Sequence, residues 1–281
     1  IQSGNLGTVS LLEALRNSDK SIKFYQASSS EMFGGGSKVL LNEESPFDPK
    51  SPYAASKVFS HNMTKLYRES YNLFCVNGIL FNHESPHRGE TFVTRKITRA
   101  VGRIHLGIQS KLTLGNLDAS RDWGFAGDYV EGMYKMLQYD TPDDWVLATG
   151  ETYTVRQFAE AAFKTIDLNW EDYVETSSKY FRPNEVEHLL GDSSKARKLL
   201  NREPKYSFDD LLDRSYAETS RGGWAAIIQH YFLTAWVPEQ LNENKLQGRF
   251  TQSNKRYSVG YTGERAYLSS GSSVLSKNTL Y

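Results

Sequence analysis

Short apolar runs alternate with longer amphipathic stretches along most of the chain up to Leu200. The apolar runs, which read as strands, cover residues 22–27, 73–81, 112–114 and 145–148. Helical spacing of apolar positions covers residues 9–16, 53–71, 93–106, 128–138, 155–166 and 193–200, and the polar stretch 82–91 predicts a loop. Strands that alternate with helices in this way predict an α/β fold built on a parallel sheet.

The pattern changes after residue 204, where Ser, Thr, Asn, Gly and Tyr become common. Short alternating pieces at 256–261 and 265–268 predict antiparallel strands. The longest apolar stretch, Trp224–Trp236, contains polar residues and is shorter than the ~18 residues of a membrane span. We therefore expect an α/β domain over residues 1–204, followed by a β-rich, sandwich-like segment over 205–281.

Composition removes several classes of function. The chain has 281 residues, and its 33 basic and 33 acidic side chains cancel, which argues against a nucleic-acid partner. Its single cysteine, Cys75, excludes a disulfide framework and a multi-cysteine metal site. No signal-peptide pattern is present, and the chain begins at Ile1 without Met, so we expect the natural N-terminus to lie upstream.

The strongest chemical signal is a tyrosine followed four residues later by a lysine. Tyr53 and Lys57 share one face of the predicted helix, and Ser28–Glu31 follow the strand before it. A nearby ammonium lowers the pKa of a tyrosine towards the range useful for acid–base catalysis. Open α/β sheets bind ligands at the carboxyl ends of their strands, where Ser28–Glu31 would lie. An ordinary surface helix also produces this spacing, so the pair alone is a weak signal.

A second motif looks like a metal site. His83, Glu84 and His87 fit the H-E-x-x-H pattern of helical zinc proteases. That chemistry requires an uninterrupted helix, and Pro86 lies inside the motif. We therefore expect no metal here.

Scattered cations form a third candidate. Each alone reads as a solvated surface charge, but together they could hold phosphates, because guanidinium groups match phosphate oxygens. The set comprises Arg88, Lys96, Arg121, Arg182 and Lys195. A dinucleotide-binding glycine turn should follow a strand, whereas Gly4 and Gly7 precede a helix and follow no strand.

Several segments together resemble the GDP-mannose 4,6-dehydratases, an extended short-chain dehydrogenase/reductase family that uses NADP. The resemblance covers about residues 6–203 and is carried by FYQASSSEMFG, SPFDPKSPYAASK, LTLGNLDASRDWGFAGDYVEGM and YFRPNEVEHLLGDSSKAR. It implies a Rossmann-like sheet with a small substrate-binding part, NADP as cofactor and GDP-mannose as substrate. It further implies the product GDP-4-keto-6-deoxymannose, a precursor in GDP-fucose synthesis, a homodimer or homotetramer, and a cytoplasmic location.

The same resemblance assigns roles to individual residues. Ser29 would hydrogen-bond the sugar hydroxyl under attack, and Glu31 would remove the proton at carbon 5 and help expel water from carbon 6. Tyr53 would be the base for the carbon-4 hydroxyl, with Lys57 lowering its pKa and holding the nicotinamide ribose. The residues implied to contact NADP are Tyr53, Lys57, His83 and Arg88, and those implied to contact GDP-mannose are Asn82, Lys96, Arg121, Arg182 and Glu185.

The chain departs from the family at both ends. The family's glycine turn and first strands have no counterpart here, so we expect an incomplete sheet, and His87 replaces an arginine of the family's NHESPRRGE loop. Residues 205–281, around GGWAAIIQHYFLTAWVP, resemble the periplasmic β-sandwich domain of the YidC insertases, which implies a periplasmic location for that part. No insertase activity follows, because no membrane helix is present.

Three other interpretations stay open at this stage. The chain could be a catalytically inactive, truncated or fused protein that acts as a sugar-nucleotide-binding or structural module. It could be another sugar-nucleotide epimerase or reductase of the same family. It could also be a β-sandwich interaction module.

Overall fold

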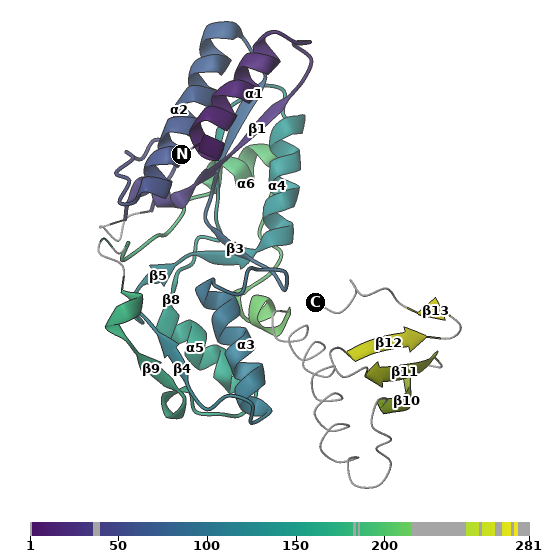
Figure 1. The fold of residues 1–281 in the computed structure, drawn as a ribbon. Helices are drawn as coiled ribbons and strands as arrows, with labels where there is room; N and C mark the ends of the chain where they lie inside the picture. Colours follow the sequence, from purple (N-terminus) through teal and green to yellow (C-terminus); the bar gives the residue numbers. More distant parts are fainter. Residues whose placement is uncertain are drawn as a thin grey trace. The chain divides into compact units, whose positions relative to one another are not determined.

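The structure is a computed structural model, and it divides into two compact units, Ile1–Ser220 and Arg221–Tyr281. It describes residues 2–35, 40–181, 184, 186–214, 246–252, 255–261, 266–270 and 273–274 (Figure 1).

A three-stranded parallel sheet lies in one part of the first unit, between two layers of helices. Its strands, in spatial order, are β1 (Phe24–Ser29), β2 (Cys75–Leu80) and β7 (Asp144–Leu147). Every residue of β2 is buried, as expected for a strand covered on both faces. Ser29 pairs with Leu80, so β1 and β2 end level with each other. The expected α/β fold with a parallel sheet is confirmed.

Helices cover both faces of this sheet (Figure 1). The two that pack together beside β1 are α1 (Gly7–Arg16), which follows a π-helical turn at Gln2–Leu6, and α2 (Pro52–Tyr71). The two that pack on the other face are α4 (Ala126–Gln138) and α6 (Ser194–Leu200). Alternate residues of β2 face the two layers: Cys75 packs with α1 and α2, whereas Val76 and Leu80 pack with α4 and α6.

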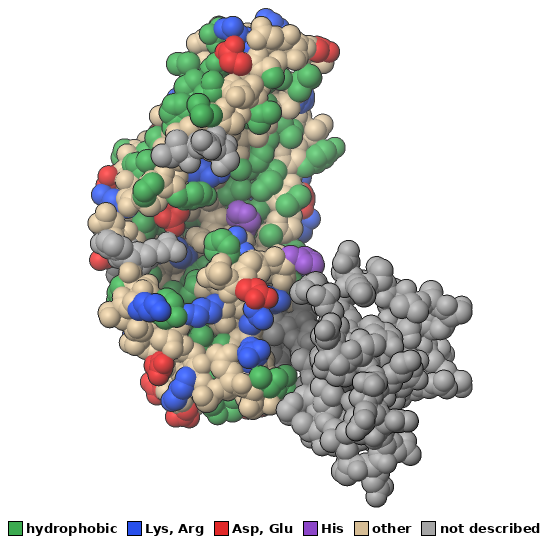
Figure 2. Space-filling view, in the orientation of Figure 1, with side chains coloured by type: hydrophobic (Ala, Val, Ile, Leu, Met, Phe, Trp, Pro, Cys, Tyr) green, Lys and Arg blue, Asp and Glu red, His purple; other side chains and the backbone are tan. Residues whose placement is uncertain are grey.

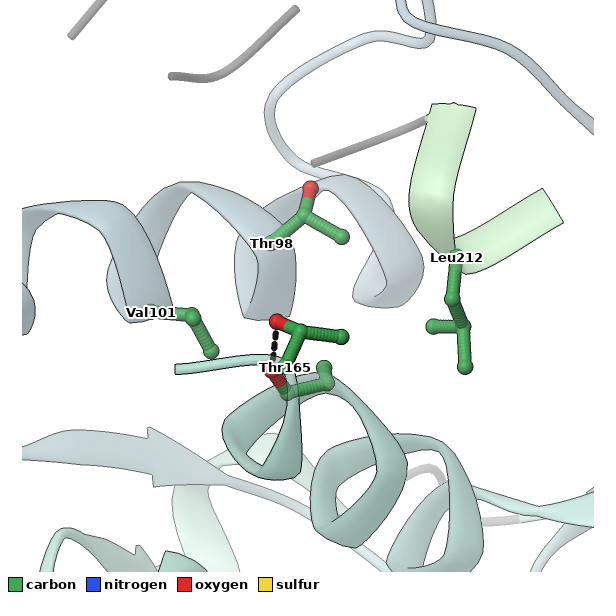
Figure 3. Close-up of a pocket in the computed structure, with 5 residues that line it drawn as sticks. Thr98, Val101, Thr165 and Leu212 are labelled. Atoms are coloured by element: carbon green, nitrogen blue, oxygen red, sulfur yellow. Dashed lines mark hydrogen bonds between the residues drawn. The ribbon is translucent and has the colours of Figure 1, made fainter. Parts of the chain in front are cut away.

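A second layered region follows in the same unit. Its helices are α3 (Val93–His105), α5 (Val155–Lys164) and residues 208–214. Thr98 and Val101 of α3 face Thr165 at the end of α5 and Leu212, and Thr165 donates a hydrogen bond to the Ala162 carbonyl (Figure 3).

Short strand pairs complete the first unit. Their strands are β3 (Asn82–Glu84) with β6 (Trp123–Phe125), β4 (Leu112–Leu114) with β9 (Val174–Thr176), and β5 (Ser120–Arg121) with β8 (Tyr153–Thr154). The prediction of a loop over 82–91 was wrong at its start, where β3 pairs with a strand far along the chain. Single 3₁₀ turns occupy Ser30–Phe33 (η2), Trp170–Asp172 (η3) and Ser178–Tyr180 (η4).

Four antiparallel strands lie in the described residues of the second unit. They are β10 (Leu246–Gln252), β11 (Lys255–Tyr261), β12 (Ala266–Ser270) and β13 (Ser273–Val274), paired in that order. The strands predicted at 256–261 and 265–268 are confirmed. The sandwich stays a prediction, and Trp224–Trp236 lies outside the described residues. In the described part of the chain, no helix is long and apolar enough to cross a membrane.

The predicted division between residues 204 and 205 also stays a prediction. Residues 208–214 are helical, and Phe208, Leu211 and Leu212 lie in the core of the first unit together with α3 and α5. The structure thus places at least this segment with the α/β part of the chain.

Candidate active site

The end of β1 carries two of the predicted catalytic residues. Ser29 is in extended conformation and caps the turn η2, and its Oγ accepts a hydrogen bond from the Glu31 amide at 3.3 Å. Gly34 ends this turn at φ 76°, and a Cβ there would lie 1.7 Å from the Asp48 carbonyl oxygen. Only glycine fits that backbone, so the turn ends at Gly34 and holds Glu31 two residues beyond the end of β1.

The helix α2 brings Tyr53 and Lys57 to the same place. Ser51 caps the helix by accepting a hydrogen bond from the Ala54 amide, and Pro52 occupies its first turn. Lys57 Nζ donates to the Ala27 carbonyl at 2.7 Å and lies 5.7 Å from the centroid of the Tyr53 ring. Burial lowers the pKa of Lys57. The turn η2 also packs against α2, so the four predicted catalytic residues come from neighbouring elements.

The end of β2 continues directly into β3, which carries Asn82 and His83. His83 Nδ1 lies 2.8 Å from the Phe81 carbonyl oxygen, and its ring stacks on Tyr129 with centroids 4.9 Å apart. Burial lowers the pKa of His83, and the nearby charge of Arg88 adds to this effect.

The H-E-x-x-H motif is used differently from a zinc site. Glu84 is buried, accepts a hydrogen bond from Thr94 at 2.6 Å and pairs with Arg88 at 3.1 Å. Arg88 in turn lies 3.6 Å above the Phe92 ring. The described residues contain no group of three or more His, Cys, Asp or Glu that could hold a metal ion.

Two of the residues predicted to bind substrate, Arg121 and Lys96, lie on β5 and α3, and a third, Asn82, lies on β3. Arg121 is buried at the end of β5, and its Nη1 donates to the Ser120 carbonyl at 2.9 Å. Lys96 of α3 donates to the Thr113 carbonyl at 2.6 Å and lies 4.1 Å from the Tyr180 ring centroid. Arg182 and Glu185 lie outside the described residues.

A hollow of about 320 Å³ opens between α3 and β4 beside Lys96. Cations outnumber carboxylates in its lining, which includes Lys96, Arg99, Arg103 and Lys111 against Glu90. Figure 2 shows Lys and Arg side chains gathered over this part of the molecule. A positive hollow of this size suits the phosphates of a nucleotide.

Lys195 does not join the other cations. Its Nζ pairs with Asp143 at 2.7 Å and donates to the Asp144 carbonyl, at the start of β7. Because the strands of a parallel sheet run in the same direction, the start of β7 lies at the opposite end of the sheet from the ends of β1 and β2. The prediction that all five cations hold phosphates together is therefore wrong for Lys195.

Sequence reasoning missed a buried polar cluster behind Lys57. Ser28, His61 and Asp144 come from β1, α2 and β7 and are 4%, 4% and 8% exposed. The available signal was that His61 follows Lys57 by one helical turn, on the same face of α2.

Comparisons with known proteins find relatives for both parts of the chain. Residues 1–215 match the family model described as GDP-mannose 4,6 dehydratase, and residues 193–281 match that of the YidC periplasmic domain. The chain is 56% identical over 210 residues to GDP-mannose 4,6 dehydratase 1 of Arabidopsis thaliana, covering 73% of this chain and 58% of that protein. It is 47% identical over 226 residues to the human GDP-mannose 4,6 dehydratase, covering 74% of this chain and 61% of that protein.

Solved structures show the same fold at lower identity. A dTDP-glucose 4,6-dehydratase from Bacillus anthracis in complex with NAD matches with a TM-score of 0.70 at 22% identity, over 78% of this chain and 68% of that one. RMD from Pseudomonas aeruginosa, complexed with NADPH, matches with a TM-score of 0.72 at 22% identity, over 78% and 74%.

Proposed function

Because the chain belongs to the GDP-mannose 4,6-dehydratase family over residues 1–215, we propose that it removes water from GDP-mannose, as an NADP-dependent lyase. The chain spans 58% of the length of its Arabidopsis relative, so the proposal rests on the residues that are present. The observation that carries it is the Tyr53–Lys57 pair beside the end of β1. The product is GDP-4-keto-6-deoxymannose.

Tyr53 serves as the base for the hydroxyl on sugar carbon 4. Its side chain is 56% exposed, so a substrate can reach it, and the Lys57 amine lies across its ring. A neighbouring ammonium favours the phenolate form that accepts this proton. Lys57 is held in place by the Ala27 carbonyl.

Glu31 acts on carbons 5 and 6 of the sugar, next to carbon 4, and Ser29 hydrogen-bonds the hydroxyl under attack. Glu31 is half-buried in η2, takes the proton from carbon 5 and donates a proton to the hydroxyl that leaves carbon 6. The Oγ of Ser29 accepts from the Glu31 amide, which leaves its own hydrogen available to donate to the sugar. One hydrogen bond thus links the residue that orients the sugar to the residue that moves its protons.

The described residues fit the nicotinamide end of NADP. Three groups lie just beyond or beside the ends of β1 and β2, where open α/β sheets bind ligands. They are the exposed Tyr53 ring, the Lys57 amine and His83. When bound there, NADP would supply the hydride acceptor for the oxidation at carbon 4 and the hydride donor for the reduction at carbon 6. Arg88 is the candidate to pair with the charged phosphates of NADP. Among the described residues, Gly4 and Gly7 follow no strand, so they do not form a phosphate-binding turn.

The nucleotide end of the substrate belongs in the positive hollow and beside β5. Lys96 and Arg121 would pair with the phosphates, and Asn82 would hydrogen-bond the substrate. Arg182 and Glu185 complete the predicted set.

The direct test is incubation of the purified chain with GDP-mannose and NADP, followed by mass spectrometry of the nucleotide. We expect a product lighter by one water from the wild-type chain and none from Tyr53→Phe. Calorimetry should show that Tyr53→Phe binds GDP-mannose about as well as wild type, because the phenol hydroxyl acts mainly in the transition state. Turnover by Tyr53→Phe at the wild-type rate would remove Tyr53 from the role of base.

We also propose that copies of the chain associate. Leu11 on α1 and Phe59 and Leu66 on α2 are 59%, 40% and 52% exposed, and the two helices pack together, so these apolar side chains are candidates for contact with a second copy. Light scattering should give a mass above one chain for wild type and a lower one for Phe59→Ser. The cytoplasmic location implied by the family and the periplasmic one implied by the tail stay predictions.

A further inference from the structure

Four buried polar side chains and that of Arg68, which is 10% exposed, form one connected network behind the proposed catalytic pair. Asp144 at the start of β7 accepts hydrogen bonds from Arg68 Nη1 and Asn77 Nδ2, both at 2.8 Å. Asn77 Nδ2 also lies 3.2 Å from the His61 carbonyl. His61 Nδ1 lies 3.0 Å from Ser28 Oγ. The network therefore joins all three strands of the sheet to α2.

The protonation of the network follows from its charges. Burial alone would raise the pKa of Asp144, but the hydrogen bonds from Arg68 and Asn77 and the charge of Arg68 act against it, and the pKa is lowered. The Asp144 carboxylate, 3.7 Å from His61 Nε2, favours the proton on that nitrogen. The Nδ1 of a neutral His61 is then an acceptor, so the Ser28 hydroxyl donates to it.

The order Ser28, His61, Asp144 resembles a hydrolase triad, but the exposure of Ser28 argues against that chemistry. A nucleophilic serine must meet a substrate, and Ser28 is only 4% exposed. The Ser28 hydroxyl also points to His61, which lies inside the core. Its effect has to reach the active site through the backbone of β1.

The position of His61 relative to Lys57 supplies that connection. The two residues are one turn apart on α2, and they contact consecutive residues of β1: Lys57 contacts Ala27, and His61 contacts Ser28. The next residue, Ser29, accepts the amide of Glu31. Two adjacent bonds thus set the position of α2 against the strand end that carries the proposed catalytic residues.

We propose that His61 is a positioning residue, which holds the end of β1 and the Lys57 amine in the geometry that the reaction requires. The inference rests on the proposed function. Displacement of a reacting group by about 1 Å costs roughly 100-fold in rate. The loss of a hydrogen bond at this point should therefore lower the rate by more than its contribution to stability alone would. The Phe47 ring, 5.0 Å from the His61 ring, holds the imidazole from the side.

The test compares four variants of the full chain. Ser28→Ala and His61→Phe remove the bond from either side, and Phe keeps the ring that packs on Phe47. His61→Asn is the conservative variant, because its amide oxygen can accept from Ser28 as Nδ1 does. Thr64→Val is the matched control: Thr64 is buried on α2, and among the described residues its hydroxyl bonds within the helix, to the Ser60 carbonyl.

Two readouts separate positioning from simple stability. Turnover of GDP-mannose should fall roughly 10- to 100-fold in kcat for Ser28→Ala and His61→Phe, with KM within about twofold. His61→Asn and Thr64→Val should keep most of kcat. The second readout is the pKa of Lys57, followed by NMR of ¹³C-methylated lysines and assigned with Lys57→Arg. It should rise in Ser28→Ala as the amine relaxes into water, and stay at the wild-type value in Thr64→Val.

The inference is overturned if Ser28→Ala matches Thr64→Val in both readouts, with only a lower melting temperature. If His61→Phe fails to fold, the Ser28→Ala and His61→Asn variants still test the inference. Absence of turnover in the wild-type chain would count against the proposed function alone, because the Lys57 titration would still report whether the network holds the amine.

Discussion

The proposed chemistry depends on a few side chains that two backbone features hold in place. The Ser51 cap starts α2 so that Tyr53 falls in its first turn, and Gly34 ends the turn that carries Glu31. Lys57 reaches back to the Ala27 carbonyl between them. Each of these residues therefore has a local reason for its position, independent of any ligand.

Replacement of Glu31 should divide the reaction into its steps. In Glu31→Gln, Tyr53 still takes the carbon-4 proton, but no base removes the carbon-5 proton. We expect nucleotide oxidised at carbon 4 that keeps its carbon-6 oxygen, as detected by mass spectrometry after a single turnover. Glu44→Gln, in an exposed turn nearby, is the control and should give the full product. Full product from Glu31→Gln would show that another group is the base.

Titration of His61 should appear in the stability of the protein. Burial lowers its pKa below the ordinary 6.5, and the charges of Arg68 and Lys65 add to this, against the opposing effect of Asp144. As the pH falls through about 6.5, the unfolded chain gains a proton that the folded chain does not. The free energy of unfolding should therefore fall with acidification, by at most about 1.4 kcal/mol per pH unit for this group.

Urea unfolding of wild type and His61→Asn between about pH 7.5 and 5.5 measures this contribution. The two free energies of unfolding should approach each other as the pH falls, because the variant lacks the His61 term. The buried His83, whose pKa burial also lowers, remains in both proteins and keeps part of the slope. Parallel curves would mean that His61 does not titrate differently in the folded state.

Among the elements, the junction between the sheet and the second layer depends on one carboxylate. Asp122 is fully buried and accepts hydrogen bonds from the Thr149 amide and hydroxyl and from the Gly150 amide, at 2.7–3.0 Å. Burial raises its pKa, while these hydrogen bonds act in the opposite direction. This single side chain joins the segment between β5 and β6 to the residues after β7.

Asp122→Ala should destabilise the protein by about 3–5 kcal/mol, because three part-buried donors lose a charged acceptor at once. Urea unfolding measures the change. Asp118→Ala removes an exposed carboxylate that pairs with Arg156 at the surface, and should change stability by no more than about 0.5 kcal/mol. Equal effects from both substitutions would contradict this account of the junction.

The elements that the sequence predicted are those with a strong local pattern. The helix predicted at 53–71 is α2, and the strand predicted at 112–114 is β4. The start of the predicted loop 82–91 is a strand because β6, far along the chain, pairs with it. The His61 network was missed for the same reason: it forms only when β1, α2 and β7 come together. The roles of the predicted site residues stay predictions.

For the whole molecule, the two family matches overlap in residues 193–215. The structure places much of this overlap inside the first unit: Ala196 and Leu200 of α6 pack on the sheet, and Phe208 and Leu211 pack with α5. The part that folds with the α/β domain therefore extends past residue 204. This can be tested by shortening the chain.

A chain that ends at residue 220 should unfold cooperatively, whereas one that ends at 204 should not. The shorter chain loses Phe208, Leu211 and Leu212, which are 8%, 1% and 3% exposed. Burial of three such side chains contributes roughly 4–8 kcal/mol, comparable with the whole stability of a domain. Thermal unfolding followed by circular dichroism distinguishes the two chains. A cooperative transition at equal temperature in both would support a boundary at 204.

The most direct measurement of the central claim uses GDP-mannose labelled with deuterium at carbon 4. The labelled substrate is incubated with the chain and NADP, and the product is examined by NMR and mass spectrometry. A dehydratase gives a product that has lost one water and carries the deuterium at carbon 6, and this is the result we predict. A product that keeps its water and its label at carbon 4, as an epimerase would give, or no product at all, would contradict the account.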